Sequence, residues 1–233
     1  MLLDQLAGEP ATGVLERDDG YTEASLPAST FFTSFDDWPA EEREAMRFVS
    51  GRVLDVGCGA GRHLLYLQRR RHDVLGIDVS PGALEVCRRR GAQAVELLSL
   101  AQITPRLGTF DTVLMLCGNF GLFGTERRAR RLLRLLVEMT TPQARLVVDS
   151  SDPIHTANPD HLAYQERNRE RGLPPGYIRV RLRYKDSATP WFELLNVSQD
   201  ELSTLLNGTG WYPSAILESA GGSNYTAVLA KSG

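Results

Sequence analysis

One ten-residue stretch, Val53–Arg62, constrains this chain more than any other part of the sequence. It reads Val-Leu-Asp-Val-Gly-Cys-Gly-Ala-Gly-Arg, a short aliphatic run followed by three glycines at alternate positions. The aliphatic run predicts a strand that is buried on both faces, and the apolar spacing after the glycines predicts a helix. Glycines at such a junction let backbone N–H groups approach a ligand closely, and the start of the helix adds partial positive charge. The stretch therefore predicts a nucleotide-binding strand–turn–helix unit.

Two acids and one arginine restrict which class of nucleotide this unit could bind. The dinucleotide fingerprint requires a glycine where this chain has Arg62, so a nicotinamide dinucleotide site is not favoured. Asp55 ends the first strand, and a buried carboxylate there would need a partner such as a ligand's ammonium group. Asp78 ends a second apolar run, Val74–Asp78, and follows Gly57 by 21 residues (78 − 57). At that separation an acid can accept hydrogen bonds from ribose hydroxyls.

These residues resemble the first two motifs of the class I S-adenosylmethionine-dependent methyltransferases. The pattern Asp55-x-Gly57-x-Gly59-x-Gly61 matches the family's first motif, and Asp78 matches the acid that ends its second strand. The resemblance extends from about residue 51 to the C-terminus. It implies S-adenosyl-L-methionine as cofactor and S-adenosyl-L-homocysteine as product, with the glycines around the methionine part. The segments 36–39 and 188–192 look like those of a subgroup of small bacterial methyltransferases with no substrate attached to it.

Candidate site residues follow from where ligands bind in open parallel sheets, beyond the carboxyl ends of the strands. The predicted cofactor-binding residues are Asp55, Gly57, Cys58, Gly59, Gly61, Arg62, Asp78, Val79, Ser99, Leu100 and Cys117. Many family members carry an acid after the third strand, and here the Ser99 hydroxyl stands in its place, facing the adenine. Asn119 follows the fourth strand, where the resemblance puts the acceptor, and is the catalytic candidate. Its amide either orients an acceptor atom or caps the turn between two glycines.

The apolar and capping patterns predict five strands alternating with helices, which means a doubly wound parallel sheet. The predicted strands are 52–56, 74–78, 92–96, 110–116 and 145–149. Two more, 211–217 and 224–229, match the antiparallel hairpin with which the family closes its sheet. The expected fold is therefore an α/β, mostly parallel seven-stranded sheet of the Rossmann-like methyltransferase type.

The remaining segments divide the chain around this core. Residues 1–50 form an N-terminal arm, 51–149 the cofactor-binding core, 150–197 an insertion after the fifth strand, and 198–233 a C-terminal helix and hairpin that complete the core. The arm's aromatic residues either pack it onto the core or let it roof the cofactor. The insertion predicts a helix over 159–171 and a hairpin of 177–184 with 191–197. It serves as a substrate cap or as a dimer element.

Composition excludes several classes of protein. A net charge of −3 over 233 residues argues against a dedicated nucleic-acid binder. No apolar run reaches the 18 residues that a membrane span needs. Three cysteines without metal-ligand spacing indicate reduced thiols of a cytoplasmic protein and no metal site. The leading hypothesis is a methyltransferase that acts by in-line displacement on a nitrogen, oxygen or carbon atom of a small molecule. Two alternatives stay open: an RNA or protein methyltransferase, and a catalytically silent cofactor-binding subunit.

Overall fold

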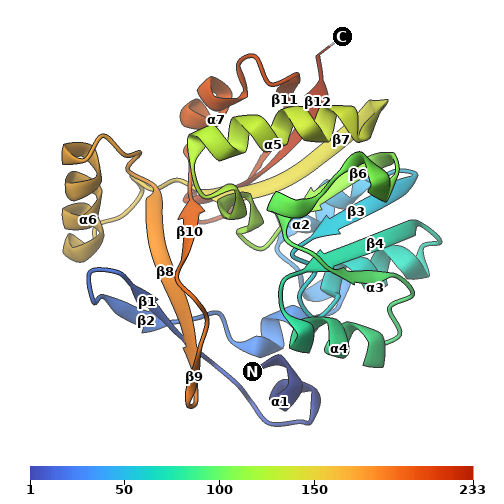
Figure 1. Ribbon diagram of the computed structural model, residues 1–233, viewed down its shortest axis with the longest axis horizontal. Coiled ribbons are helices and arrows are strands. Elements are labelled where there is room, and N and C mark those ends of the chain that lie inside the picture. Colours follow the sequence, from blue (N-terminus) through green and yellow to red (C-terminus); the bar gives the residue numbers. More distant parts are fainter. Residues whose placement is uncertain (233) are drawn as a thin grey trace.

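The computed structural model describes residues 1–232 and is built on a seven-stranded sheet (Figure 1). The strand order is β11-β12-β7-β6-β3-β4-β5. Neighbours from β7 to β5 run parallel, while β12 runs antiparallel to both β7 and β11. The strands are β3 (Arg52–Val56), β4 (Asp73–Asp78), β5 (Val95–Leu97), β6 (Phe110–Met115), β7 (Thr140–Ser151), β11 (Trp211–Glu218) and β12 (Asn224–Lys231). The predicted fold class is confirmed.

Helices cover both faces of this sheet. Successive residues of a strand point to opposite faces, so a strand that is apolar throughout has side chains to bury on both sides. Leu54 and Val56 of β3 belong to one buried cluster, with side chains of α5 (Glu126–Glu138) and α7 (Gln199–Leu206). Val53 belongs to the other cluster, with side chains of α2 (Ala40–Ala45), α3 (Arg62–Arg69) and α4 (Pro81–Arg89). The carboxyl ends of β3, β4, β6 and β7 border the cavities described below.

A second sheet joins the N-terminal arm to the insertion. Its strand order is β10-β8-β1-β2, and β9 pairs with β8. The arm supplies β1 (Val14–Arg17) and β2 (Thr22–Ala24), and the insertion supplies β8 (Tyr177–Tyr184), β9 (Ser187–Ala188) and β10 (Phe192–Leu195). In Figure 1 the blue arm strands lie against the orange β8, far from each other in sequence. The sequence predicted the hairpin of the insertion but not the strands of the arm.

Helical segments tie this second sheet to the rest of the molecule. In the insertion, α6 (Pro159–Glu170) buries Tyr164, whose hydroxyl donates to Asp18 Oδ1 at 2.9 Å. The arm begins with α1 (Leu2–Leu6) and continues through 3-10 turns at 28–32, 35–37 and 46–48. Further 3-10 turns lie at 100–102, 105–107 and 119–123. Phe35 of the arm stacks on Tyr66 of α3 with ring centroids 4.5 Å apart, so the arm is packed directly onto the core.

Across residues 1–232, no helix has the length and the apolar composition needed to traverse a bilayer.

Candidate functional site

A cavity of about 790 Å³ lies at the carboxyl ends of β3, β4 and β6 and is the larger of two adjoining cavities. The glycine turn contributes Gly57, Cys58 and Gly59, and the ends of the neighbouring strands contribute Asp78 and Cys117. Both glycines have positive φ, +72° and +54°, a backbone conformation that side-chain-bearing residues rarely adopt. The bare backbone of this turn is therefore exposed to whatever fills the cavity.

The arm and the second sheet form the opposite wall of the larger cavity. Their lining residues are mostly apolar: Leu2, Leu15, Leu26, Phe31, Leu182, Phe192 and Leu194. These side chains come from the N-terminal arm and from the insertion, so this wall of the cavity depends on the pairing of β1 with β8.

Asp78 is held in a fixed position at the end of β4. Its Oδ2 accepts from the backbone N–H of Gly59 at 3.0 Å, and its Oδ1 accepts from that of Ser80 at 2.8 Å. Burial raises the pKa of this carboxyl. Each carboxylate oxygen has a second lone pair, so Asp78 can still accept two hydrogen bonds from a ligand.

Asn119 holds the glycine turn from the other side. Its Nδ2 donates to the carbonyl oxygens of Val56 at 2.9 Å and Gly57 at 3.2 Å. A Cβ atom at position 57 would lie 2.7 Å from this nitrogen, which explains why only glycine fits there. The amide nitrogen of Asn119 is thus committed to the backbone. The side chain lines the cavity, and its contact with an acceptor stays a prediction.

Arg62 lies at the centre of a buried polar cluster between α2, α3 and the end of β6. Its guanidinium contacts Glu42 Oε2 at 2.6 Å and donates to Cys117 Sγ at 3.2 Å. Glu42 Oε2 also lies 3.2 Å from His63 Nε2, and the Trp38 ring lies 4.9 Å from the guanidinium carbon. The ligating atoms of Glu42, His63 and Cys117 lie within 4.8 Å of one another. Since the Arg62 cation touches two of these groups, it disfavours a metal ion among them.

Two predicted cofactor ligands of the first motif lie behind the cavity wall. Asp55 is 2% exposed, does not line the cavity and has an Oδ2 without a hydrogen-bond partner in the described chain. Burial raises its pKa to about 6. Gly61 adopts φ +81° as the N-cap of α3, where a Cβ would lie 3.1 Å from Cys87 Sγ. Both residues therefore support the glycine turn from the side that faces away from the cavity.

The three residues predicted to lie near the adenine, Val79, Ser99 and Leu100, do not lie together in the structure. Val79 is exposed and Leu100 is buried in the core, and neither lines the larger cavity. The Ser99 hydroxyl donates to Gln102 Oε1 at 2.8 Å and caps the short 3-10 turn that follows. Adenine contacts of these residues stay predictions, whereas Gly57, Cys58, Gly59, Arg62, Asp78 and Cys117 all line the larger cavity.

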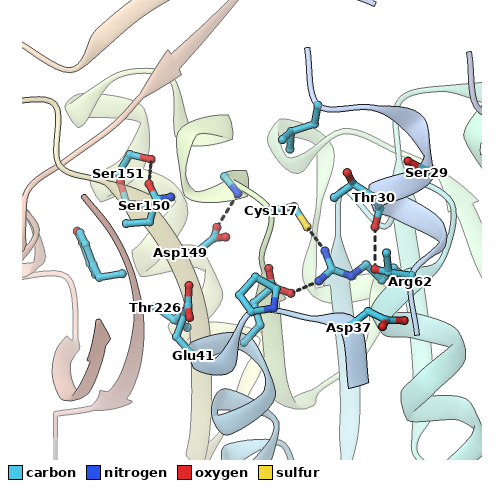
Figure 2. A pocket seen from close by; sticks show the side chains of 17 residues that line it. Ser29, Thr30, Asp37, Glu41, Arg62, Cys117, Asp149, Ser150, Ser151 and Thr226 are labelled. Atoms are coloured by element: carbon cyan, nitrogen blue, oxygen red, sulfur yellow. Dashed lines mark hydrogen bonds and ion pairs between the residues drawn. The ribbon is translucent and has the colours of Figure 1, made fainter. Parts of the chain in front are cut away.

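A smaller cavity of about 630 Å³ adjoins the larger one (Figure 2). The two share Leu26, Arg62, Cys117 and Gly118 in their walls. Its lining carries four carboxylates: Asp37, Glu41, Glu42 and Asp149. Asp149 ends β7, and its Oδ1 accepts from the Gly118 N–H at 2.7 Å. Burial raises the pKa of Asp149 to about 7, although the Gly118 hydrogen bond opposes this shift.

Asp149 ends the strand predicted over 145–149, but the sequence analysis missed the acids of the arm. Glu41 and Glu42 fall in the first turn of a helix that follows Pro39, where acids are common for reasons of helix stability alone. Only the packing of α2 against α3 distinguishes the buried Glu42 from its neighbour. The sequence contained no separate signal for that difference.

Comparison with known proteins shows which family this chain resembles. Residues 53–143 match a family model described as a methyltransferase domain. The Bacillus subtilis protein YqeM, named as a methyltransferase, is 28% identical over 132 residues, which cover 54% of this chain and 53% of YqeM. The chain thus spans about half the length of the curated relatives it matches.

Solved structures extend the similarity over the whole chain. A methyltransferase from Bacteroides fragilis, solved in complex with S-adenosyl-L-homocysteine, matches with a TM-score of 0.82 and 25% identity. That match covers 99% of this chain and 92% of the other. The CcbJ methyltransferase from Streptomyces caelestis shares the fold, with a TM-score of 0.61, 15% identity and coverage of 85% and 95%.

Proposed function

Because this chain belongs to the class I S-adenosylmethionine-dependent methyltransferases, we propose that it transfers a methyl group to a nitrogen, oxygen or carbon atom of a small molecule. Its cofactor is S-adenosyl-L-methionine, and S-adenosyl-L-homocysteine is the product. The cofactor supplies a methyl group activated by a positively charged sulfur. The protein must hold both reactants in a defined position, which can lower the activation barrier by about 7–11 kcal/mol in the best-oriented cases.

The larger cavity fits the cofactor. Gly57 and Gly59 present bare backbone to it, and a Cβ at position 57 would collide with Asn119. Asp78, fixed by two backbone N–H groups, offers its free lone pairs to ribose hydroxyls. Cys117 lies at the end of β6, where the methionine part would reach the boundary with the smaller cavity.

The shared wall of the two cavities is the observation that carries the proposal. An acceptor in the smaller cavity and a cofactor in the larger one would meet at Arg62, Cys117 and Gly118. Displacement requires the acceptor atom to approach the methyl carbon from the side opposite the sulfur. Two adjoining chambers allow this approach without either ligand leaving its own binding groups.

The form of the smaller cavity favours a small acceptor over RNA. The arm closes it on one side through Leu26, Ser29 and Thr30. Its four carboxylates would repel a phosphate backbone, and the net charge of −3 gives no long-range attraction for one. We assign the arm (residues 1–50) and the insertion (residues 150–197) to a cap that selects the acceptor. The alternative is that the insertion pairs with a second subunit.

Two measurements test this function. Calorimetric titration should show saturable binding of S-adenosyl-L-methionine and S-adenosyl-L-homocysteine and no binding of NAD. Incubation with methyl-labelled S-adenosyl-L-methionine and a cell extract should place the label in the small-molecule fraction. Label found only in RNA or protein would refute the small acceptor. Cofactor binding without any label transfer would favour the silent subunit.

A further inference from the structure

The smaller cavity carries an excess of negative charge that the protein does not neutralise. Glu42 is paired with Arg62 at 2.6 Å. In the chain from 1 to 232, no lysine, arginine or histidine forms an ion pair with Asp37, Glu41 or Asp149. A cavity with an excess of one sign of charge attracts ligands of the opposite sign.

A buried hydroxyl without a partner gives independent evidence for a ligand in this cavity. Thr226 is 1% exposed and lines the cavity, and its Oγ1 has no hydrogen-bond partner among the described residues. Such a group costs about 1–3 kcal/mol when it is left unpaired. A ligand N–H or O–H group would satisfy it.

Thr226 and Asp149 are placed to bind the same group. They are directly opposite each other in the β12–β7 register, so their side chains lie on the same face of the sheet with Cβ atoms about 4.5–5.5 Å apart. In Figure 2 they lie on one side of the cavity, with Cys117 and Arg62 on the other. One lone pair of Asp149 is used by Gly118, which leaves its Oδ2 free. An ammonium group has three donors and no acceptor, and it matches these two oxygens.

We propose that the acceptor is a small, positively charged amine, and that Asp149 binds its ammonium group and takes one of its protons. This inference rests on the proposed function and specifies the acceptor of the same site. Asp149 acts next to Gly118, at the wall shared by the two cavities, so the nitrogen it holds faces the cofactor chamber.

The proton and electron balance of the step is complete. The carboxylate of Asp149 accepts one proton from the ammonium group and leaves a neutral amine with a free lone pair. That lone pair forms a bond to the methyl carbon while the carbon–sulfur bond breaks and its electron pair remains on sulfur. The nitrogen gains the positive charge that the sulfur loses, and Asp149 releases its proton to water as the product leaves.

The groups that face Asp149 favour a carboxyl able to exchange protons near neutral pH. Burial is the main cause of its raised pKa, and the charge of Glu42 on α2 adds to it. His63 on α3 and the N–H groups of Cys117 and Gly118 act in the opposite direction. The neighbouring Tyr225 of β12 stays neutral, because burial raises the pKa of its hydroxyl far above the neutral range.

Matched compounds test the charge of the acceptor. Protein saturated with S-adenosyl-L-homocysteine is titrated with three sets, each with a cationic, a neutral and an anionic member of similar size: ethanolamine, ethylene glycol and glycolate; tyramine, tyrosol and 4-hydroxyphenylacetate; glucosamine, glucose and glucuronate. At least one amine should bind at millimolar concentration and more tightly than its neutral and anionic counterparts. Tighter binding of a neutral or anionic member, or no binding by any of the three amines, would overturn the inference. Failure to bind S-adenosyl-L-homocysteine would instead refute the proposed function.

Two variants identify the residues responsible. Asp149→Asn should weaken binding of the amine about 10- to 100-fold and leave the affinity for S-adenosyl-L-homocysteine unchanged. Asp186→Asn, in an exposed turn, is the matched control and should change neither. Thr226→Val should weaken the amine severalfold while raising the unfolding midpoint, because it removes an unsatisfied buried hydroxyl. Equal amine affinity in wild type and both cavity variants would overturn the assignment.

Discussion

Replacing Asp55 by asparagine should remove a pH-dependent cost to the stability of the protein. Asp55 is buried beneath the glycine turn with one unpartnered oxygen, and burial raises its pKa from 3.8 to about 6. A carboxyl with a raised pKa binds its proton more tightly in the folded state than in the unfolded chain. Its favourable contribution is therefore complete below pH 3.8 and is lost as the pH rises through about 6.

The size of the effect follows from the shift in pKa. A shift of about two units corresponds to about 3 kcal/mol, of which about 2 kcal/mol appears between pH 4.5 and pH 8. Asparagine keeps the shape of the side chain and cannot ionise. The free energy of unfolding of Asp55→Asn, minus that of the wild type, should thus increase by about 2 kcal/mol over this range.

Urea unfolding at pH 4.5 and pH 8, followed by circular dichroism, measures both differences. Titrating groups that do not interact with Asp55 are present in both proteins and cancel. Asp186→Asn is the control, since Asp186 lies in an exposed turn and has no ion pair among residues 1–232, and it should show no comparable change. An Asp55→Asn difference that is the same at both pH values would show that the buried carboxyl has an ordinary pKa, and the argument from burial would fail.

Three further substitutions probe the cofactor chamber and its support. Asp78→Ala should weaken binding of S-adenosyl-L-homocysteine about 10- to 100-fold by calorimetry, because charge-assisted hydrogen bonds to the ribose are lost; an unchanged dissociation constant would make Asp78 only a strand-end cap. Asn119→Ala should weaken the same ligand about 3- to 10-fold by loosening the glycine turn, and full affinity would refute the positioning role. Glu42→Ala should lower the free energy of unfolding by about 3–5 kcal/mol because it leaves the Arg62 cation buried without a partner; the result is checked by urea unfolding against Glu41→Ala, and equal losses in the two variants would contradict it.

The parallel sheet could be predicted because its strands carry their own signals. The buried runs at β3, β4 and β6 are mostly apolar; β3 is followed by Gly57, and β4 ends at Asp78. The alternation of Tyr177–Tyr184 matches the bounds of β8. The arm strands carry no comparable signal. β1 has four residues, and all three residues of β2 are exposed, so no periodic burial marks them. Their position depends on pairing with β8, which sequence spacing does not encode.

The predicted site residues differ in the same respect: some follow from local chain geometry, and others depend on packing between distant segments. The spacing of the glycine turn and Asp78 follows from local chain geometry, and both line the larger cavity. Asp55 lies in the same motif, yet its distance from the cavity depends on how α3 packs above it. The charge state of Asp149 depends on burial by segments distant in sequence, so the strand-end position alone could not reveal it.

The pairing of β1 with β8 also has a consequence for the order in which the molecule forms. Val14 pairs with Arg183, and these residues are separated by 169 positions (183 − 14). Contacts between distant residues carry a large loop-closure cost, and they form slowly compared with neighbours such as β3 and β4. A nascent chain emerges N-terminus first, so the arm must wait for β8 before it can pair. We therefore expect the glycine turn to stay open to solvent through most of synthesis and the ligand chambers to close last.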